Sequence, residues 1–327
     1  MERLRFLAQV AALLALAMMP AHADDAATFP TRAIRVIVAF PPGGGPDPLA
    51  RIVASGLERR LGQPVIVENM PGGSGSLAAR ATVRGGPDGY TLLFADMTFI
   101  VSPHVTANFG VNPLKDFEPV GRAATSPFSL IVSAAVPASN LPDFIKLAKA
   151  RPDEVMIGHA GIGTTPYLGA VAFTKAADIK PRFISYKGMA DAMTNAMSGI
   201  ISGLFSAGPA AISSSKNDKL KVLAVTGDKR MAQLPNIPTF GESGITLRGF
   251  ESGAWFGLMA PAGTPPGVIQ KLNTALNDIA NDKTLMAKFE SAGAEFKPGT
   301  PQEFRDQLIA QDKLWGATLA ELGVKPQ

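Results

Sequence analysis

The residues of this chain best suited to bind a ligand lie in three short glycine-rich loops. Each loop follows an apolar run and precedes a segment whose apolar residues recur at helical spacing. A helix N-terminus carries unpaired backbone N–H groups and a partial positive charge, and glycine lets a ligand approach them closely. One such loop more often makes only a tight turn, but three in one chain favour an anion-binding cleft. The loops are Pro41-Pro42-Gly43-Gly44-Gly45, Pro71-Gly72-Gly73-Ser74-Gly75 and Gly161-Ile162-Gly163-Thr164-Thr165.

Residue types that catalyse reactions or hold metals are scarce in the chain. It has no Cys, and beyond residue 23 only His104 and His159 remain, without the H-x-x-x-H spacing of a zinc site. A serine hydrolase would show G-x-S-x-G after a strand, and the segment around Ser74 lacks the last glycine. We therefore expect a protein that is not an enzyme and has no metal, with a hydrolase on a similar α/β frame as an alternative.

A dinucleotide site is another alternative that the sequence raises. Residues 73–78 fit the pattern G-x-G-x-x-A and follow a strand-like run. Pro71 lies just before this match, and Asp96 is the only acidic residue near the place where a ribose ligand belongs. A single match of this kind is weak evidence, so we expect no cofactor.

The segments around the loops predict an α/β fold. Strand-like runs at 34–40 and 65–67 each lead through a glycine-rich loop into a helix, and the alternation restarts after residue 129. Strands that alternate with helices form parallel sheets, whose ligand crevice lies at the carboxyl ends of the strands. Further strands are expected at 91–94, 129–132, 156–158, 183–186, 222–226 and 255–259, and helices at 49–61, 77–83, 141–149, 168–174, 265–279, 284–292 and 301–322.

The N-terminus has the order of a cleaved secretory signal. Arg3 and Arg5 precede an apolar run over 6–19, which ends at Pro20 and the small-residue site Ala21-His22-Ala23. A membrane anchor is the alternative, but the run is shorter than the roughly 20 residues that span a bilayer. We expect export, with cleavage after Ala23.

Length and charge limit the remaining classes. The chain has 327 residues and a formal charge of +4, a size at which one core commonly divides into two domains. Its Lys and Arg residues are scattered and form no basic-aromatic cluster, so we expect no nucleic-acid partner.

Short motifs along the whole exported chain occur in a specific order. Near its start are Phe29-Pro30-Thr31-Arg32 and Phe40-Pro41-Pro42-Gly43-Gly44-Gly45, followed by Pro87-Asp88-Gly89-Tyr90-Thr91. Later come Gly161-Ile162-Gly163-Thr164 and Ala260-Pro261-Ala262-Gly263-Thr264-Pro265-Pro266. In order and spacing these motifs resemble the Bug receptors, the extracytoplasmic solute receptors of tripartite tricarboxylate transporters.

The resemblance implies a periplasmic binding protein fold. In that fold two α/β lobes, joined by two crossing strands, close over a small carboxylate in the cleft between them. Residues 1–23 would be the signal peptide, 24–124 and 250–327 the first lobe, and 125–249 the second. It also implies a periplasmic monomer that delivers its ligand to the integral membrane subunits of a transporter.

The resemblance further implies which residues hold the ligand. The first glycine-rich loop would form one wall of the cleft and the third loop the other, with the residues after the third strand as the floor. Largely neutral donors suit this task, because they bind a carboxylate and still permit release. The residues carried over by position are Phe40, Pro42, Gly43, Gly44, Asp96, Met97, Thr98, Ser126, Gly161, Gly163, Thr164, Thr165, Tyr167 and Ser206.

Three departures from the family pattern bear on the choice of ligand. Pro46 stands where Thr is common, and Tyr167 stands where His is common. Ser206 replaces a common Asp, which removes an acidic partner for a ligand amine. These departures favour a mono- or dicarboxylate that has no amine. Aromatic carboxylates belong to this class. A receptor that reports its ligand to a two-component sensor instead of a transporter remains an alternative.

Overall fold

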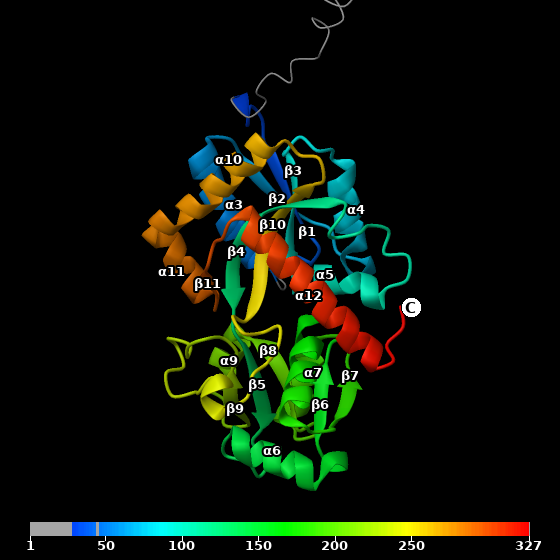
Figure 1. Ribbon diagram of the computed structural model, residues 1–327. Coiled ribbons are helices and arrows are strands. Elements are labelled where there is room, and N and C mark those ends of the chain that lie inside the picture. The colour runs from blue at the N-terminus through cyan, green and yellow to red at the C-terminus, as the bar shows by residue number, and fades with distance from the viewer. Residues whose placement is uncertain (1–27, 44–45, 327) are drawn as a thin grey trace, which may run out of the picture.

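The computed structural model describes residues 28–43 and 46–326, which form two α/β lobes, each built on one sheet (Figure 1). The predicted α/β fold with two lobes is confirmed. The expected signal peptide and Gly44 lie outside the described residues. Within those residues, no helix is both long and apolar enough to cross a membrane.

The first sheet has the strand order β11-β4-β10-β3-β1-β2. Its parallel part consists of β1 (Ile34–Val38), β2 (Val65–Asn69) and β3 (Thr91–Asp96). The strand β10 (Ala254–Pro261) runs antiparallel to both β3 and β4 (Phe117–Ser126), and β11 (Glu295–Phe296) closes the edge. The helices of this lobe are α3 (Asp47–Leu61), α4 (Ser76–Arg84), α5 (Met97–Val105), α10 (Pro266–Asn277), α11 (Lys283–Ser291) and α12 (Pro301–Glu321).

The second sheet has the order β7-β6-β8-β5-β9. Its strands are β5 (Phe128–Ser133), β6 (Met156–His159), β7 (Arg182–Ser185), β8 (Gly203–Ala207) and β9 (Leu220–Val225). Its helices are α6 (Leu141–Ala150), α7 (Thr165–Ala177), α8 (Met189–Met197) and α9 (Gly208–Ser214). Single 3₁₀ turns lie at Gly73–Gly75, Pro152–Glu154, Gly241–Ser243 and Asp278–Asn281.

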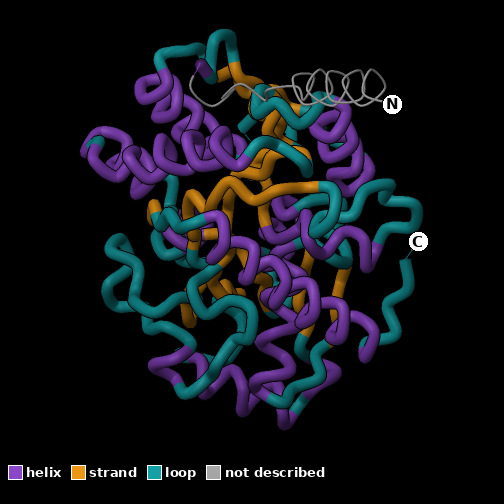
Figure 2. Tube along the Cα trace, turned by 45° about the horizontal axis from the view of Figure 1, so that its top comes forward, coloured by secondary structure: helices purple, strands orange, loops and turns teal. Residues whose placement is uncertain are grey.

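Helices cover the strands of both sheets (Figure 2), because alternate side chains of each strand point to opposite faces. In β1, Ile34, Val36 and Val38 pack towards α3 and α10, whereas Ile37 packs into the core on the other face. All four side chains are fully buried. Burial on both faces explains why this strand reads as a continuous apolar run rather than as an alternating one.

Several elements were not predicted from the sequence. The strand β4 contains Pro119 and Gly121, which usually interrupt a strand. Here a Cβ on Gly121 would lie 2.7 Å from the amide nitrogen of Asn273, so the close approach of α10 requires glycine. The helix α5 is apolar on nearly all sides and includes Pro103, which hides the helical period.

The lobes are joined where β4 runs through Pro127 directly into β5, and where the chain returns before β10. The two connections touch, since a Cβ on Gly253 would lie 2.6 Å from the carbonyl oxygen of Ser126. The long helix α12 crosses the junction (Figure 1). Its Trp315 ring packs 5.9 Å from that of Phe250, and its Glu321 pairs with Lys175 of α7.

Candidate functional site

A cavity of about 190 Å³ lies between the two lobes. It is bounded by the ends of β1 and β3, the loop before α4, one side of α5, and the loop between β6 and α7. The carboxyl ends of β1, β3 and β6 meet here, as expected of a ligand crevice in a sheet with parallel strands. Its lining residues are Ala39, Phe40, Gly72, Ser74, Gly75, Leu93, Phe94, Ala95, Asp96, Thr98, Phe99, Ser102, Val105, Ile162, Gly163 and Thr164.

The lobes are in contact across this cavity. The Thr98 hydroxyl on the first lobe lies 3.3 Å from the Thr165 hydroxyl on the second. Gly163 packs against Val105 so tightly that a Cβ at this position would lie 2.7 Å from the valine Cγ2. The structure therefore shows the two lobes closed on one another.

The loop of the second lobe is ordered by its own hydrogen bonds. The Thr164 hydroxyl donates to the Gly161 carbonyl at 2.7 Å, and the Gly161 N–H donates to Nδ1 of His159 at 3.1 Å. Gly163 has a φ of +82°, in the left-handed region that favours glycine. This turn places the N-terminus of α7 at the cavity, so its first N–H groups and partial positive charge can serve an anion.

The corresponding loop of the first lobe is occupied by a side chain of the protein itself. Oδ2 of Asp47 accepts from the Gly43 N–H at 2.8 Å and pairs with Nε of Arg51 at 3.0 Å. The Asn69 amide donates to Oδ1 of Asp47 at 2.7 Å and to the carbonyl oxygen of Phe40 at 2.9 Å. The start of α3 therefore holds the carboxylate of Asp47. The Gly43 N–H donates to this carboxylate and not to a ligand.

Asp96 is the one acidic or basic side chain among the residues that line the cavity. It is 9% exposed, at the end of β3 and at the N-cap of α5. Burial raises the pKa of Asp96 to about 6, although hydrogen bonds from Thr98 and from the backbone of Phe99 act in the opposite direction. A perturbed carboxyl group in a cleft makes this residue a candidate for a functional role.

Five of the residues expected from the sequence line the cavity together, and Thr165 adjoins it through its contact with Thr98. They come from both lobes, and from segments of the chain that are separated by 56 residues (Phe40 to Asp96) and by 65 residues (Thr98 to Gly163). The five are Phe40, Asp96, Thr98, Gly163 and Thr164.

The other described residues of the expected set do not line this cavity. Pro42 and Gly43 are exposed on the outer side of their loop, and the Met97 side chain is fully buried in the core. Gly161 lies at the start of its loop, before the lining residues, and its N–H donates to Nδ1 of His159. The ring of Tyr167 packs between those of His159 and Phe183, at centroid distances of 4.9 and 5.6 Å.

Ser126 and Ser206 are held by the backbone around the junction of the lobes. The Ser126 hydroxyl donates to the Gly293 carbonyl at 2.8 Å. Ser206 is buried in β8, where its carbonyl accepts from the Ser129 hydroxyl at 3.2 Å. Neither residue is among those that line the cavity.

The cavity also contains residues that were absent from the expected set. Gly72, Ser74 and Gly75 come from the second glycine-rich loop, which the sequence marked as a loop at a strand end. Ser102 lies on α5, and its hydroxyl donates to the carbonyls of Ser74 and Thr98 at 2.8 Å. No local pattern signals Ser102, because its role depends on a segment 28 residues away.

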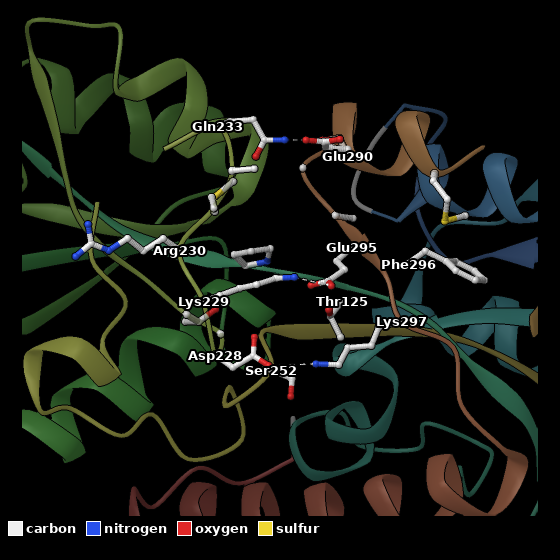
Figure 3. A pocket seen from close by; sticks show the side chains of 18 residues that line it. Thr125, Asp228, Lys229, Arg230, Gln233, Ser252, Glu290, Glu295, Phe296 and Lys297 are labelled. Atoms are coloured by element: carbon white, nitrogen blue, oxygen red, sulfur yellow. Dashed lines mark hydrogen bonds and ion pairs between the residues drawn. The ribbon is translucent and has the colours of Figure 1, made fainter. Parts of the chain in front are cut away.

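A second and larger cavity, of about 300 Å³, lies behind the junction of the lobes (Figure 3). Lys229 of the second lobe pairs with Glu295 of the first lobe at 2.8 Å. Lys297 of the first lobe pairs with Asp228 of the second at 3.5 Å. The Gln233 amide also donates across the cavity to the carbonyl oxygen of Glu290 at 3.2 Å. These side chains hold the lobes to each other, so we assign the ligand to the smaller cavity between the glycine-rich loops.

A metal site was not expected, and no group of three or more His, Asp or Glu side chains in residues 28–43 and 46–326 is placed to hold an ion. The uncharged loops and the N-terminus of α7 at the cavity can instead hold an anion through backbone N–H donors.

Residues 49–324 match the model of a family described as tripartite tricarboxylate transporter family receptor. Protein BugT of Bordetella pertussis is 31% identical over 329 residues, with 99% of both chains covered. Two similar structures come from Rhodopseudomonas palustris. One, a protein with adipate, is 30% identical, with a TM-score of 0.78, covering 91% of this chain and all of the other. The second, MatC with bound malate, is 27% identical, with a TM-score of 0.74, covering 89% of this chain and all of the other.

Proposed function

We propose that this chain, which belongs to the tripartite tricarboxylate transporter receptor family of Bug proteins, captures a small carboxylate in the cavity between its lobes. Members of the family are solute-binding receptors with the periplasmic binding protein fold, and this chain is such a receptor rather than an enzyme. Receptors of this family work with membrane transporter components.

One observation carries the proposal: loops of both lobes enclose a single cavity at the N-terminus of α7. Because Thr98 and Gly163 come from different lobes, a ligand in this cavity touches both lobes only when they are closed. Its binding energy therefore shifts the protein towards the closed form to the extent that it binds that form better. Reversible capture needs no catalytic residue.

The ligand class is a small mono- or dicarboxylate. The cavity of about 190 Å³ is smaller than the roughly 300–1,000 Å³ of pockets for drug-sized molecules. The two Rhodopseudomonas palustris structures contain the dicarboxylates adipate and malate, which supports this class. Since Tyr167 and Ser206 do not line the cavity, their departures from the family pattern act on the ligand only indirectly.

The place of the protein in the cell forms part of the proposal. The chain acts as a monomer in the periplasm after cleavage behind Ala23, and hands its ligand to the membrane subunits of a tripartite tricarboxylate-type transporter. The first lobe comprises 24–124 and 250–327, and the second 125–249. The positions at which β4 ends and β10 begins, Ser126 and Ala254, support these boundaries.

The test is a thermal-shift screen of the purified protein against aliphatic and aromatic carboxylates, followed by calorimetry on those that raise the melting temperature. A ligand present at a hundred times its Kd stabilises the folded state by about 2.7 kcal/mol, which such a screen detects. Adipate and malate are the first compounds to test. A screen in which amines or sugars stabilise the protein and no carboxylate does would contradict the proposal.

A further inference from the structure

Asp96 occupies an unusual position for a receptor of anions. Its carboxyl group lines the cavity that is proposed to receive a carboxylate, and no Lys, Arg or His side chain lines the cavity with it. With 9% of its surface exposed, it has little water to solvate a negative charge. A second carboxylate placed beside it would meet like-charge repulsion in a poorly solvated space.

The charged groups on the surrounding elements are engaged elsewhere. On α4, Arg80 donates to the Ser76 hydroxyl at 3.2 Å, and on α5, His104 pairs with Asp312 of α12 at 2.8 Å. On α3, Asp47 and Arg51 pair with each other. From the second lobe, Nδ1 of His159 accepts from the Gly161 N–H. No cation among these described groups neutralises Asp96.

Asp96 is connected to the opposite lobe by two hydroxyl groups. The Thr98 hydroxyl donates to Oδ2 of Asp96 at 3.2 Å and lies 3.3 Å from the Thr165 hydroxyl. Because Thr98 has one hydroxyl proton, and gives it to Asp96, Thr165 must donate to Thr98. The contact that closes the lobes thus continues to the Asp96 carboxyl.

We propose that Asp96 takes up one proton from solvent when a carboxylate enters the cavity, and that its O–H then donates a hydrogen bond to the ligand. In this step the bond between the proton and a hydronium ion or buffer acid breaks, and an O–H bond forms at a carboxylate oxygen of Asp96. The total charge in the cavity therefore does not become more negative than that of the ligand. Short O–H···O⁻ bonds are among the strongest hydrogen bonds in proteins. The inference rests on the proposed function, since it requires a carboxylate ligand at this site.

The titration behaviour of Asp96 is compatible with this role. Burial raises its pKa to about 6 before any ligand is present, and a neighbouring anion raises it further. Near neutral pH Asp96 of the free receptor is therefore mostly ionised, and a bound carboxylate favours its protonation. Proton uptake should therefore accompany binding at pH 7.

The experiment is calorimetry with adipate and with malate, in buffers of different ionisation enthalpy, from pH 6.5 to pH 8, where both ligands are fully ionised. We expect the apparent enthalpy to vary with the buffer in the sense of uptake of one proton per ligand. Above pH 6 the affinity should fall towards about tenfold per pH unit, as linkage requires for one proton. Binding without proton uptake at pH 8 overturns the inference and leaves the proposed function intact, whereas absence of binding to every carboxylate tested overturns the proposed function itself.

Two variants separate Asp96 from other titrating groups. Asp96→Asn preserves shape and is an equally good N-cap residue for α5, so it should fold, bind adipate with nearly constant affinity at pH 6.5 to 8, where the ligand is fully ionised, and take up no proton. Asp153→Asn removes a carboxylate from the 3₁₀ turn Pro152–Glu154, before β6, and should keep the pH dependence of the unmodified protein. Retention of that pH dependence by Asp96→Asn would overturn the inference.

The alternative hypothesis is that the ligand carries an ammonium group, which would neutralise Asp96 in place of a proton. The probe 6-aminohexanoate has the length of adipate and carries –CH₂NH₃⁺ in place of one –COO⁻. Tighter binding of this probe than of adipate at pH 8, without proton uptake and abolished in Asp96→Asn, would show that Asp96 pairs with a ligand cation instead.

Discussion

The hydroxyl groups of Thr98 and Thr165 lie 3.3 Å apart and form a hydrogen bond between the two lobes. Thr98 is in the first turn of α5, directly after β3, and Thr165 is the first residue of α7. Both helices begin at the cavity, so this contact joins the two walls at the ligand site. Its loss should therefore affect closure more than the stability of either lobe.

Thr165→Val tests this contact. Valine keeps the shape of the side chain and removes the hydroxyl that donates to Thr98, so closure loses a hydrogen bond of about 0.5–1.5 kcal/mol. We expect roughly a three- to tenfold weaker affinity for adipate by calorimetry. The matched control is Thr174→Val on the same helix, whose hydroxyl bonds to Val171 at 3.0 Å, and it should bind adipate normally. Equal losses in both variants would deny the contact a specific role.

Gly163→Ala should hinder closure sterically. The added Cβ would lie 2.7 Å from Cγ2 of Val105 on the other lobe, and such overpacking costs about 1–3 kcal/mol. We expect roughly five- to 150-fold weaker carboxylate binding and a larger radius of gyration in small-angle scattering.

Gly161→Ala is the control for Gly163→Ala. Gly161 also has a positive φ, +118°, but an added Cβ would find no atom closer than 3.9 Å. Both variants place alanine at a positive φ, which favours glycine, so both should melt earlier. Only Gly163→Ala should lose affinity strongly; a similar loss in Gly161→Ala would point to strain in the loop rather than to closure.

Asp96→Asn should stabilise the ligand-free protein at neutral and alkaline pH. The pKa of Asp96 is about 6 in the folded protein against the ordinary value of 3.8, so between these values the folded state binds more protons than the unfolded state. Stability then falls as pH rises through this window, by on the order of 3 kcal/mol at about 1.4 kcal/mol per pKa unit. Because asparagine does not titrate, the free energy of unfolding of Asp96→Asn does not fall over this pH range.

Chemical denaturation of the ligand-free protein at several pH values measures the effect. The free energy of unfolding of Asp96→Asn should exceed that of the unmodified protein at pH 8, and the difference should shrink as pH falls from 6 to 4. A difference that is the same at pH 4 and pH 8 would show that the carboxyl group titrates normally.

Asp47→Asn should have the opposite dependence on pH. Although burial raises the pKa of Asp47, hydrogen bonds from Arg51, Gly43 and Asn69 are together stronger and hold it below the ordinary value. Its contribution to stability is therefore present above the unfolded-state pKa and is lost as pH falls through the folded-state pKa. We expect a loss of about 1–3 kcal/mol at pH 7, measured by denaturation, that diminishes towards pH 3. Unchanged stability at pH 7 would mean that the carboxylate does not hold the first glycine-rich loop.

Much of the fold could be predicted because its signals are local. The run at 34–40 and the spacing of Leu49, Val53 and Leu57 predict β1 and α3, and both are present. The elements missed were those with mixed signals. Pro119 and Gly121 in β4 look like turn residues, and only the approach of Asn273 from α10 explains the glycine.

The sequence by itself determined the family, the alternation of strands and helices, and the glycine-rich loops at strand ends, because these depend on residue types at short spacing. Only the tertiary structure decided how the loops are used. Asp47 occupies the loop that contains Gly43, whereas Asp96 is brought to Thr165 through Thr98. Such pairings join residues far apart in the chain, and their protonation depends on burial that no local pattern encodes.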